Sequence, residues 1–297
     1  MQRKTKTSSR VEEQHTSPNP RHKKSKIGLT ATLPPVVISV DVWSHVVMFC
    51  NTPEWIQLSY TCKDLNRFKF CKELMKSKRR TMNKELSPDE ITKYFTMCKG
   101  TLFNVHLRRN HLNIRDSHLS FLEGIHALNI CACVYLTDDA FKYLKGIHTL
   151  NMVHCSQYRI TDEAFAHLKG IHTLSMIGCT QETITDKAFE NLKGIHTLKM
   201  SKCRQETITD KAFENLKGIH TLDMSYCRQN AITDKAFENL KGIHTLDMTY
   251  CNQNTITDKA FDNLKGIHTL SMIRCKQETI TDKAFENLKG IHTLDMS

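Results

Sequence analysis

A 24-residue repeat occupies the carboxyl-terminal two-thirds of this 297-residue chain and limits what the chain can fold into. The pattern IHTLxMxxCxQxxITDKAFxNLKG recurs without gaps in five copies over residues 171–290. Three looser copies precede it from residue 101, and a ninth begins at Ile291 and stops at Ser297. A fixed period of this length is typical of solenoids, in which each unit contacts only its neighbours. We therefore expect residues 101–297 to form one array of about eight repeats and a truncated ninth.

Each copy predicts one strand and one short helix. The alternating pair Leu222 and Met224 predicts a short strand with one buried face. Thr233 or Asp234 predicts the start of a helix, since both residue types cap helices and the acid suits the positive helix end. Gly242 predicts the end of that helix, where a positive φ is often required.

Stacking is what lets such units fold. One copy has too few large apolar side chains to offset the entropy lost in ordering 24 residues. Neighbouring copies pair their strands and join their apolar edges into a single core. This predicts two internal columns, one of phenylalanine and one of cysteine. They comprise Phe141, Phe165, Phe189, Phe213, Phe237, Phe261 and Phe285, and Cys133, Cys155, Cys179, Cys203, Cys227, Cys251 and Cys275.

The array resembles leucine-rich repeats of the cysteine-containing kind, with LxxLxLxxC followed by ITD in each copy. The resemblance implies an α/β fold, a horseshoe-shaped solenoid with a parallel sheet on its concave face. One thiol per repeat is interpreted as a small buried hydrophobe, because ligands spaced one per strand do not converge on a metal ion. The histidines at the second position, from His126 to His292, are expected to form surface ring stacks, with a pH-sensitive role as the alternative.

Variation among the five tight copies is concentrated at positions five, seven, eight and ten, counted from the isoleucine of IHTL. Positions five and seven face away from the buried leucine and methionine, which places them on the concave face. Drift at exposed sites is the alternative, but the exposed Lys and Asn of KAFxNLK do not vary. The predicted partner-binding residues are Lys199, Lys202, Asp223, Tyr226, Asp247, Tyr250 and Arg274.

The chemistry of this strip favours a protein partner. Rigid tyrosines beside charges of both signs are typical of interaction hot spots. The formal net charge of +11 does not point to nucleic acid here, because residues 101–297 contribute only +1 of it. Residues 1–32 carry much of the rest and are expected to be a disordered basic tail. Residues 21–26, RHKKSK, are either a nuclear-import patch or a solvated part of that tail.

Residues 33–75 resemble an F-box, a small helical module. AspValTrp at 41–43 and CysLysAspLeuAsn at 62–66 carry the match, whereas Ile38-Ser39 stands where the family has Leu-Pro. The resemblance implies docking on a Skp-type adaptor, and the alternative is a plain helical cap for the array. The residues expected to dock or to form the module's own core are Val42, Trp43, Val46, Trp55, Ile56 and Leu65.

Residues 76–100 are expected to be a helical linker or amino-terminal cap. Ser87, Pro88 and Glu90 predict a helix start there, with Ser at the cap and Glu three residues later. An F-box followed by leucine-rich repeats implies the substrate-recognition adaptor of a Skp-cullin-F-box ubiquitin ligase, which holds a protein target near the enzyme. The alternative is an interaction scaffold with no ubiquitin role.

Other functions find little support in the sequence. It contains no GxxxxGK[ST], GxGxxG, HExxH or GxSxG motif, so we expect neither an enzyme nor a bound cofactor or metal. No apolar run is long enough to cross a membrane, and the first residues do not resemble a secretory signal, which predicts an intracellular protein of the cytoplasm or nucleus. The strand of the ninth copy predicts an uncapped edge near Phe285 and Leu288, through which copies of the chain could associate.

Overall fold

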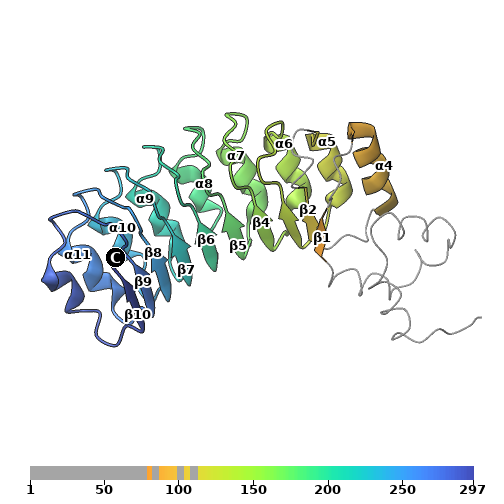
Figure 1. Ribbon diagram of the computed structural model, residues 1–297. Helices are drawn as coiled ribbons and strands as arrows, with labels where there is room; N and C mark the ends of the chain where they lie inside the picture. The colour runs from red at the N-terminus through yellow and green to blue at the C-terminus, as the bar shows by residue number, and fades with distance from the viewer. Residues whose placement is uncertain (1–78, 82–86, 99–103, 108–112) are drawn as a thin grey trace, which may run out of the picture. The chain divides into compact units, whose positions relative to one another are not determined.

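The repeat array forms one continuous sheet with helices along its other side. The computed structural model describes residues 79–81, 87–98, 104–107 and 113–297. Within them, ten short strands lie in chain order, each pairing in parallel with the next. The strands follow one another along one side of the array and the helices along the other (Figure 1). This arrangement confirms the predicted solenoid of parallel strands.

The strands are three residues long. They are β1 (Arg79–Thr81), β2 (Asn104–His106), β3 (Ala127–Asn129), β4 (Thr149–Asn151), β5 (Thr173–Ser175), β6 (Thr197–Lys199), β7 (Thr221–Asp223), β8 (Thr245–Asp247), β9 (Thr269–Ser271) and β10 (Thr293–Asp295). The prediction of strands over Leu-x-Met was therefore wrong in its bounds by one residue. The methionine follows the strand, although its backbone N–H still donates to the neighbouring copy, as Met176 does to the Lys199 carbonyl at 2.8 Å.

The helices of the array are single turns. They are α5 (Asp116–Leu119), α6 (Asp138–Phe141), α7 (Asp162–Phe165), α8 (Asp186–Glu190), α9 (Asp210–Phe213), α10 (Asp234–Glu238) and α11 (Asp258–Phe261), after the longer α4 (Pro88–Cys98). Turns of 3₁₀ helix are η1 (Ser120–Leu122), η2 (Lys142–Leu144), η3 (Ala166–Leu168), η4 (Glu214–Leu216), η5 (Asp262–Leu264) and η6 (Asp282–Phe285). Isolated helices this short are unstable in water, so packing on the sheet maintains them.

Threonine and aspartate divide two tasks at each helix start. Thr233 caps α10, since its side chain accepts a hydrogen bond from the backbone N–H of Lys235. Asp234 instead faces the next copy, where its carboxylate accepts from the N–H of Thr257 at 2.7 Å and from its hydroxyl at 2.8 Å. The same pair of bonds recurs along the array from Asp116–Thr137 to Asp258–Thr281. The TD pair thus caps one helix and ties that helix to its neighbour.

The core runs unbroken through the array. The phenylalanines from Phe141 to Phe261 are fully buried, and the cysteines from Cys133 to Cys251 have no exposed surface. Each thiol from Cys155 onward also donates a hydrogen bond to a backbone carbonyl of the preceding copy, as Cys227 does to Met200 at 3.2 Å. The predicted columns therefore exist from Phe141 to Phe261 and from Cys133 to Cys251, whereas Phe285 and Cys275, also predicted to be internal, are only half-buried.

The segment before the array contains more than the predicted helix. Ser87 and Glu90 form the expected reciprocal cap of α4, with backbone-to-side-chain distances of 2.9 and 3.3 Å. Upstream of that helix, β1 pairs with β2, so the sheet begins before residue 101. Residues 76–100, predicted to be a helical linker, thus contribute a strand as well as a helix. The basic tail and the F-box-like segment lie outside the described residues.

Candidate functional site

The predicted binding residues, at positions five and eight, lie together on the side of the array that carries the sheet, whereas Ser201 and Ser225 at position seven, also predicted to lie on the concave face, are buried. Position five is the last residue of each strand, and position eight is the second residue beyond the buried methionine. Lys199, Lys202 and Arg274 are exposed, and the other predicted binding residues are half-buried. None of the seven points into the core. We call the surface formed by Lys199, Lys202, Asp223, Tyr226, Asp247, Tyr250 and Arg274 the variable strip.

Position eight has an unusual backbone. Each described copy turns there with a positive φ, from 54° at Arg274 to 68° at Gly178. Glycine adopts this left-handed conformation without cost, whereas other residues are strained in it and usually persist where they have a function. Ala132 and His154, outside the variable strip, have this conformation as well, with φ of 57°, so the turn belongs to the repeat; within the strip, Lys202, Tyr226 and Tyr250 have φ of 62°, 60° and 58°. The copy that contains Gly178 shows that the turn itself does not need a side chain.

The two tyrosines form a stacked pair between cations. The ring centroids of Tyr226 and Tyr250 are 4.6 Å apart and their planes differ by 16°. The Lys202 ammonium lies 5.5 Å from the Tyr226 centroid, and the Arg274 guanidinium lies 5.6 Å from that of Tyr250. Arg228 approaches Tyr250 at 5.9 Å as well. Both outer ring faces are therefore covered by cations, which leaves ring edges and hydroxyl groups for a ligand.

Two carboxylates accompany the tyrosines. Asp223 of β7 and Asp247 of β8 are directly paired in the parallel register, so like charges face each other across adjacent strands. One oxygen of each accepts a backbone hydrogen bond, from Ser225 at 3.0 Å and from Thr249 at 2.9 Å. The second oxygen of each has no hydrogen-bond partner within the described part of the chain. The strip thus holds two solvent-accessible negative charges side by side.

Two further polar columns run along the array outside the strip. The glutamines at position eleven, such as Gln229, are buried, and most donate to a cysteine carbonyl of the preceding copy, 3.2 Å away for Gln229 and Cys203. This column was not predicted, although a glutamine at the same position of every copy from Gln157 onward is a signal for it. The histidines at position two, one in each copy from His126 to His292, form the expected ring stack, with the centroids of neighbouring rings 4.5 Å apart.

The buried thiols have strongly altered acidity. Removal from water raises the pKa of Cys155 and of Cys203 to about 12, and it raises the pKa of Cys227 as well. A thiol that stays protonated is neither a nucleophile nor a metal ligand. Within the described residues, no group of three or more His, Cys, Asp or Glu is placed to hold a metal ion. The cysteine column is therefore not a reactive site at neutral pH.

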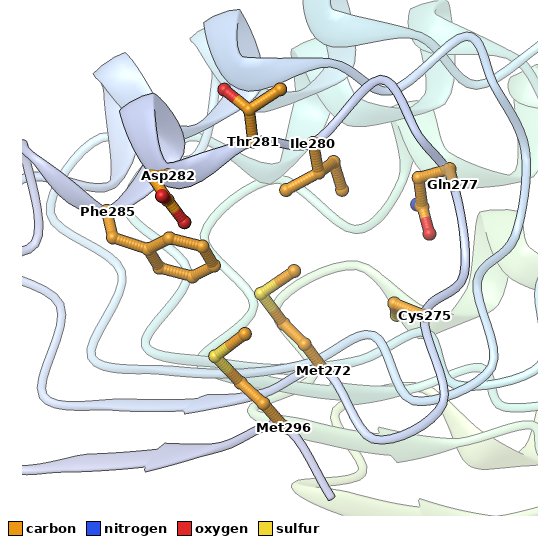
Figure 2. Close-up of a pocket in the computed structure, with 8 residues that line it drawn as sticks. All are labelled: Met272, Cys275, Gln277, Ile280, Thr281, Asp282, Phe285 and Met296. Atoms are coloured by element: carbon orange, nitrogen blue, oxygen red, sulfur yellow. The ribbon is translucent and has the colours of Figure 1, made fainter.

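A cavity of about 190 Å³ lies beside the last copy. Figure 2 shows Met272 and Met296 directed toward Phe285 in this cavity. Met272 and Phe285 line this cavity. The residues at the same positions of the preceding copy, Met248 and Phe261, are fully buried under their neighbours. The cavity is thus the stacking surface of a repeat rather than a shaped ligand pocket. Self-association through this edge stays a prediction.

The adaptor-docking candidates cannot be placed. Val42, Trp43, Val46, Trp55, Ile56 and Leu65 all lie outside the described residues. Their predicted role therefore still depends on the sequence alone. In the part of the chain that the structure describes, no helix combines the length and apolar character that a membrane span requires.

Comparison with known proteins identifies the repeats. A family model described as BspA type leucine-rich repeat region matches six copies within residues 158–292, so these residues are similar to leucine-rich repeats. No curated protein matches the sequence. The match supports the predicted class of repeat, the leucine-rich repeat. The family model covers somewhat less than half of the chain.

Solved structures show the same fold at low sequence identity. The chain is similar to TLR13 in its complex with ssRNA13, with a TM-score of 0.59, 18% identity, and coverage of 78% of this chain and 34% of that one. For the Drosophila Toll–Spatzle complex the TM-score is 0.54, with 18% identity and coverage of 68% and 31%. A yeast Rad7–Elc1 complex follows, with a TM-score of 0.48, 16% identity and coverage of 72% and 66%. The chain spans about a third of the length of the first two proteins.

Proposed function

We propose that the array is a protein-binding scaffold that takes its partner on the variable strip. The observation that carries this proposal is the stacked pair Tyr226–Tyr250, held on two left-handed residues and flanked by Lys202 and Arg274. Stability alone favours glycine at these turns. Rigid aromatic side chains with charges around them provide contact area and selectivity in protein interfaces.

The double substitution Tyr226→Gly with Tyr250→Gly tests the proposal. We expect the melting temperature to change by only a few degrees. Relief of the left-handed strain, about 1 kcal/mol or more at each turn, offsets the lost ring contacts, about 0.5–1.5 kcal/mol. Binding of a peptide selected on the intact chain from a random display library should weaken at least tenfold, as measured by fluorescence anisotropy.

A control on the opposite side of the array separates binding from folding. Lys187→Ser with Lys211→Ser changes two exposed residues of α8 and α9 and should leave peptide affinity unchanged. The proposal is wrong if the glycine variant keeps full affinity, or if selection yields no peptide that prefers this chain to an unrelated protein. A large fall in melting temperature would instead show that the tyrosines are there for stability.

We further propose that the scaffold is the target-binding part of a ubiquitin-ligase adaptor. This finer function is supported by the F-box-like motifs at 41–43 and 62–66, which precede the array in the order typical of such adaptors. The chain itself would break no bond. It would hold a target lysine near an enzyme that carries ubiquitin, which raises the effective concentration of that lysine.

A pull-down with a purified Skp-type adaptor tests this second step. We expect the full chain to bind the adaptor, and Trp43→Ala with Val46→Asp to abolish binding while leaving the circular dichroism melt of the array unchanged. If the intact chain does not bind the adaptor, the scaffold function stands without a ubiquitin role.

A further inference from the structure

We infer that the variable strip recognises an extended peptide segment with the pattern acid–x–base–x–acid, laid across the strands. This inference rests on the proposed scaffold function and specifies the chemistry of its partner. Three features of the strip carry it: the order of charges along the array, the spacing of the copies, and the direct pairing of Asp223 with Asp247, of which only Asp223 has a cation, Lys199, paired on its other side.

The charges at positions five and eight follow a definite order along the array. The copy that begins at residue 195 presents Lys199 and Lys202. The next two copies present Asp223 and Asp247 at the strand ends, with Arg228 farther along the chain beside the tyrosine pair, and the copy after them presents Arg274. At positions five and eight, a ligand that crosses these four copies therefore meets positive, negative, negative and positive charge.

The spacing of the copies sets the spacing of the ligand's side chains. Adjacent strands are about 4.8 Å apart, so the first and fourth copies of the strip are separated by roughly 14 Å. An extended peptide rises about 3.3 Å per residue, and residues i, i+2 and i+4 share one face. Side chains i and i+4 therefore reach Lys202 and Arg274. Side chain i+2 falls midway, between Asp223 and Asp247.

The aspartate pair explains why the central residue must be basic. Like charges directly opposite each other on adjacent strands destabilise a sheet. No ion pair within 4.0 Å joins Lys199 or Lys202 to either carboxylate in the described part of the chain. A lysine or arginine between the two carboxylates relieves this repulsion and can bond to their unpartnered oxygens. Lys202 and Arg274 lie over the tyrosine faces but are exposed, so they can also contact the flanking acidic residues of the peptide.

The array itself offers a conservative control at the aspartate position. In earlier copies the same position holds Asn129 and Asn151, whose side-chain oxygens accept from the backbone N–H of Cys131 and Val153 at 2.9 and 3.1 Å. Asp223 and Asp247 accept the equivalent bonds. Asp223→Asn with Asp247→Asn therefore removes both charges while retaining the local hydrogen bonds.

Three synthetic peptides, titrated against the full-length chain by fluorescence anisotropy at low salt, test the inference. They contain Glu-Ser-Arg-Ser-Glu, the inverse Arg-Ser-Glu-Ser-Arg, and Glu-Glu-Arg-Ser-Ser, which has the first composition with the wrong spacing. We expect the first to bind at least tenfold more tightly than the others. The double asparagine variant should lose this preference, and Asp223→Lys with Asp247→Lys should prefer a fourth peptide, Glu-Ser-Glu-Ser-Glu.

The outcomes distinguish this inference from the scaffold function. Equal affinity for the first and inverse peptides, or no effect of the asparagine variant, would overturn the acid–x–base–x–acid pattern. The scaffold function would survive that result if peptides selected from the random library still lost affinity in the tyrosine-to-glycine variant. Failure of both experiments would remove the strip as a binding surface.

Discussion

Raising the pH from 8 to 10 is expected to lower the free energy of unfolding of the array by roughly 2 kcal/mol for each fully buried thiol, so that several such thiols together rival the total stability of many domains. The cause is the column of buried thiols, since burial raises the pKa of Cys155 and Cys203 to about 12 and also raises the pKa of Cys227. The unfolded thiols ionise near pH 8.5, whereas the folded ones stay protonated.

The sign follows from this difference. The column's stabilising effect is complete below the unfolded pKa and is lost as the pH rises toward the folded pKa, at about 1.4 kcal/mol per thiol and pH unit. Chemical denaturation under reducing conditions at half-unit pH steps measures it. Replacing Cys179, Cys203 and Cys227 with serine, which does not ionise in this range, should roughly halve the slope. If the slope of the free energy of unfolding against pH does not change in this variant, ionisation of lysine and tyrosine side chains causes the pH dependence instead.

The substitution Phe213→Ala is expected to cost about 3–5 kcal/mol and to disrupt cooperativity. Phe213 is fully buried in the middle of the phenylalanine column. Its loss leaves a cavity at the interfaces with both neighbouring copies. Because each repeat contacts only its neighbours, a central defect also weakens the coupling between the two halves of the array. Denaturant unfolding followed by circular dichroism should show a lower midpoint and a broader transition.

Phe285→Ala provides the comparison for this prediction. Phe285 occupies the same position in the last full copy but is only half-buried, and its ring contacts Phe261 at a centroid distance of 6.1 Å. A smaller loss, about 1 kcal/mol, with an unchanged transition width is expected. Equal losses at the two positions would contradict a column whose strength comes from burial between neighbouring copies.

The candidate site was only partly predictable from the sequence. Variation among otherwise near-identical copies singled out Tyr226, Tyr250 and the charged residues beside them, because such variation is visible in one chain. The left-handed turns, the cations over the rings and the register of Asp223 with Asp247 were not predictable. Each of these depends on the neighbouring copy, about 24 residues away in the sequence.

The sequence by itself determined the repeat length, the alternation of strand and helix, and the buried columns, because periodic apolar spacing has few ways to be buried. Only the tertiary structure decided the division of labour within the TD pair and the hydrogen bonds of the buried glutamines. The physical reason is that polar side chains at a repeat interface can be satisfied locally or by a neighbour, and the stacking distance selects between these partners.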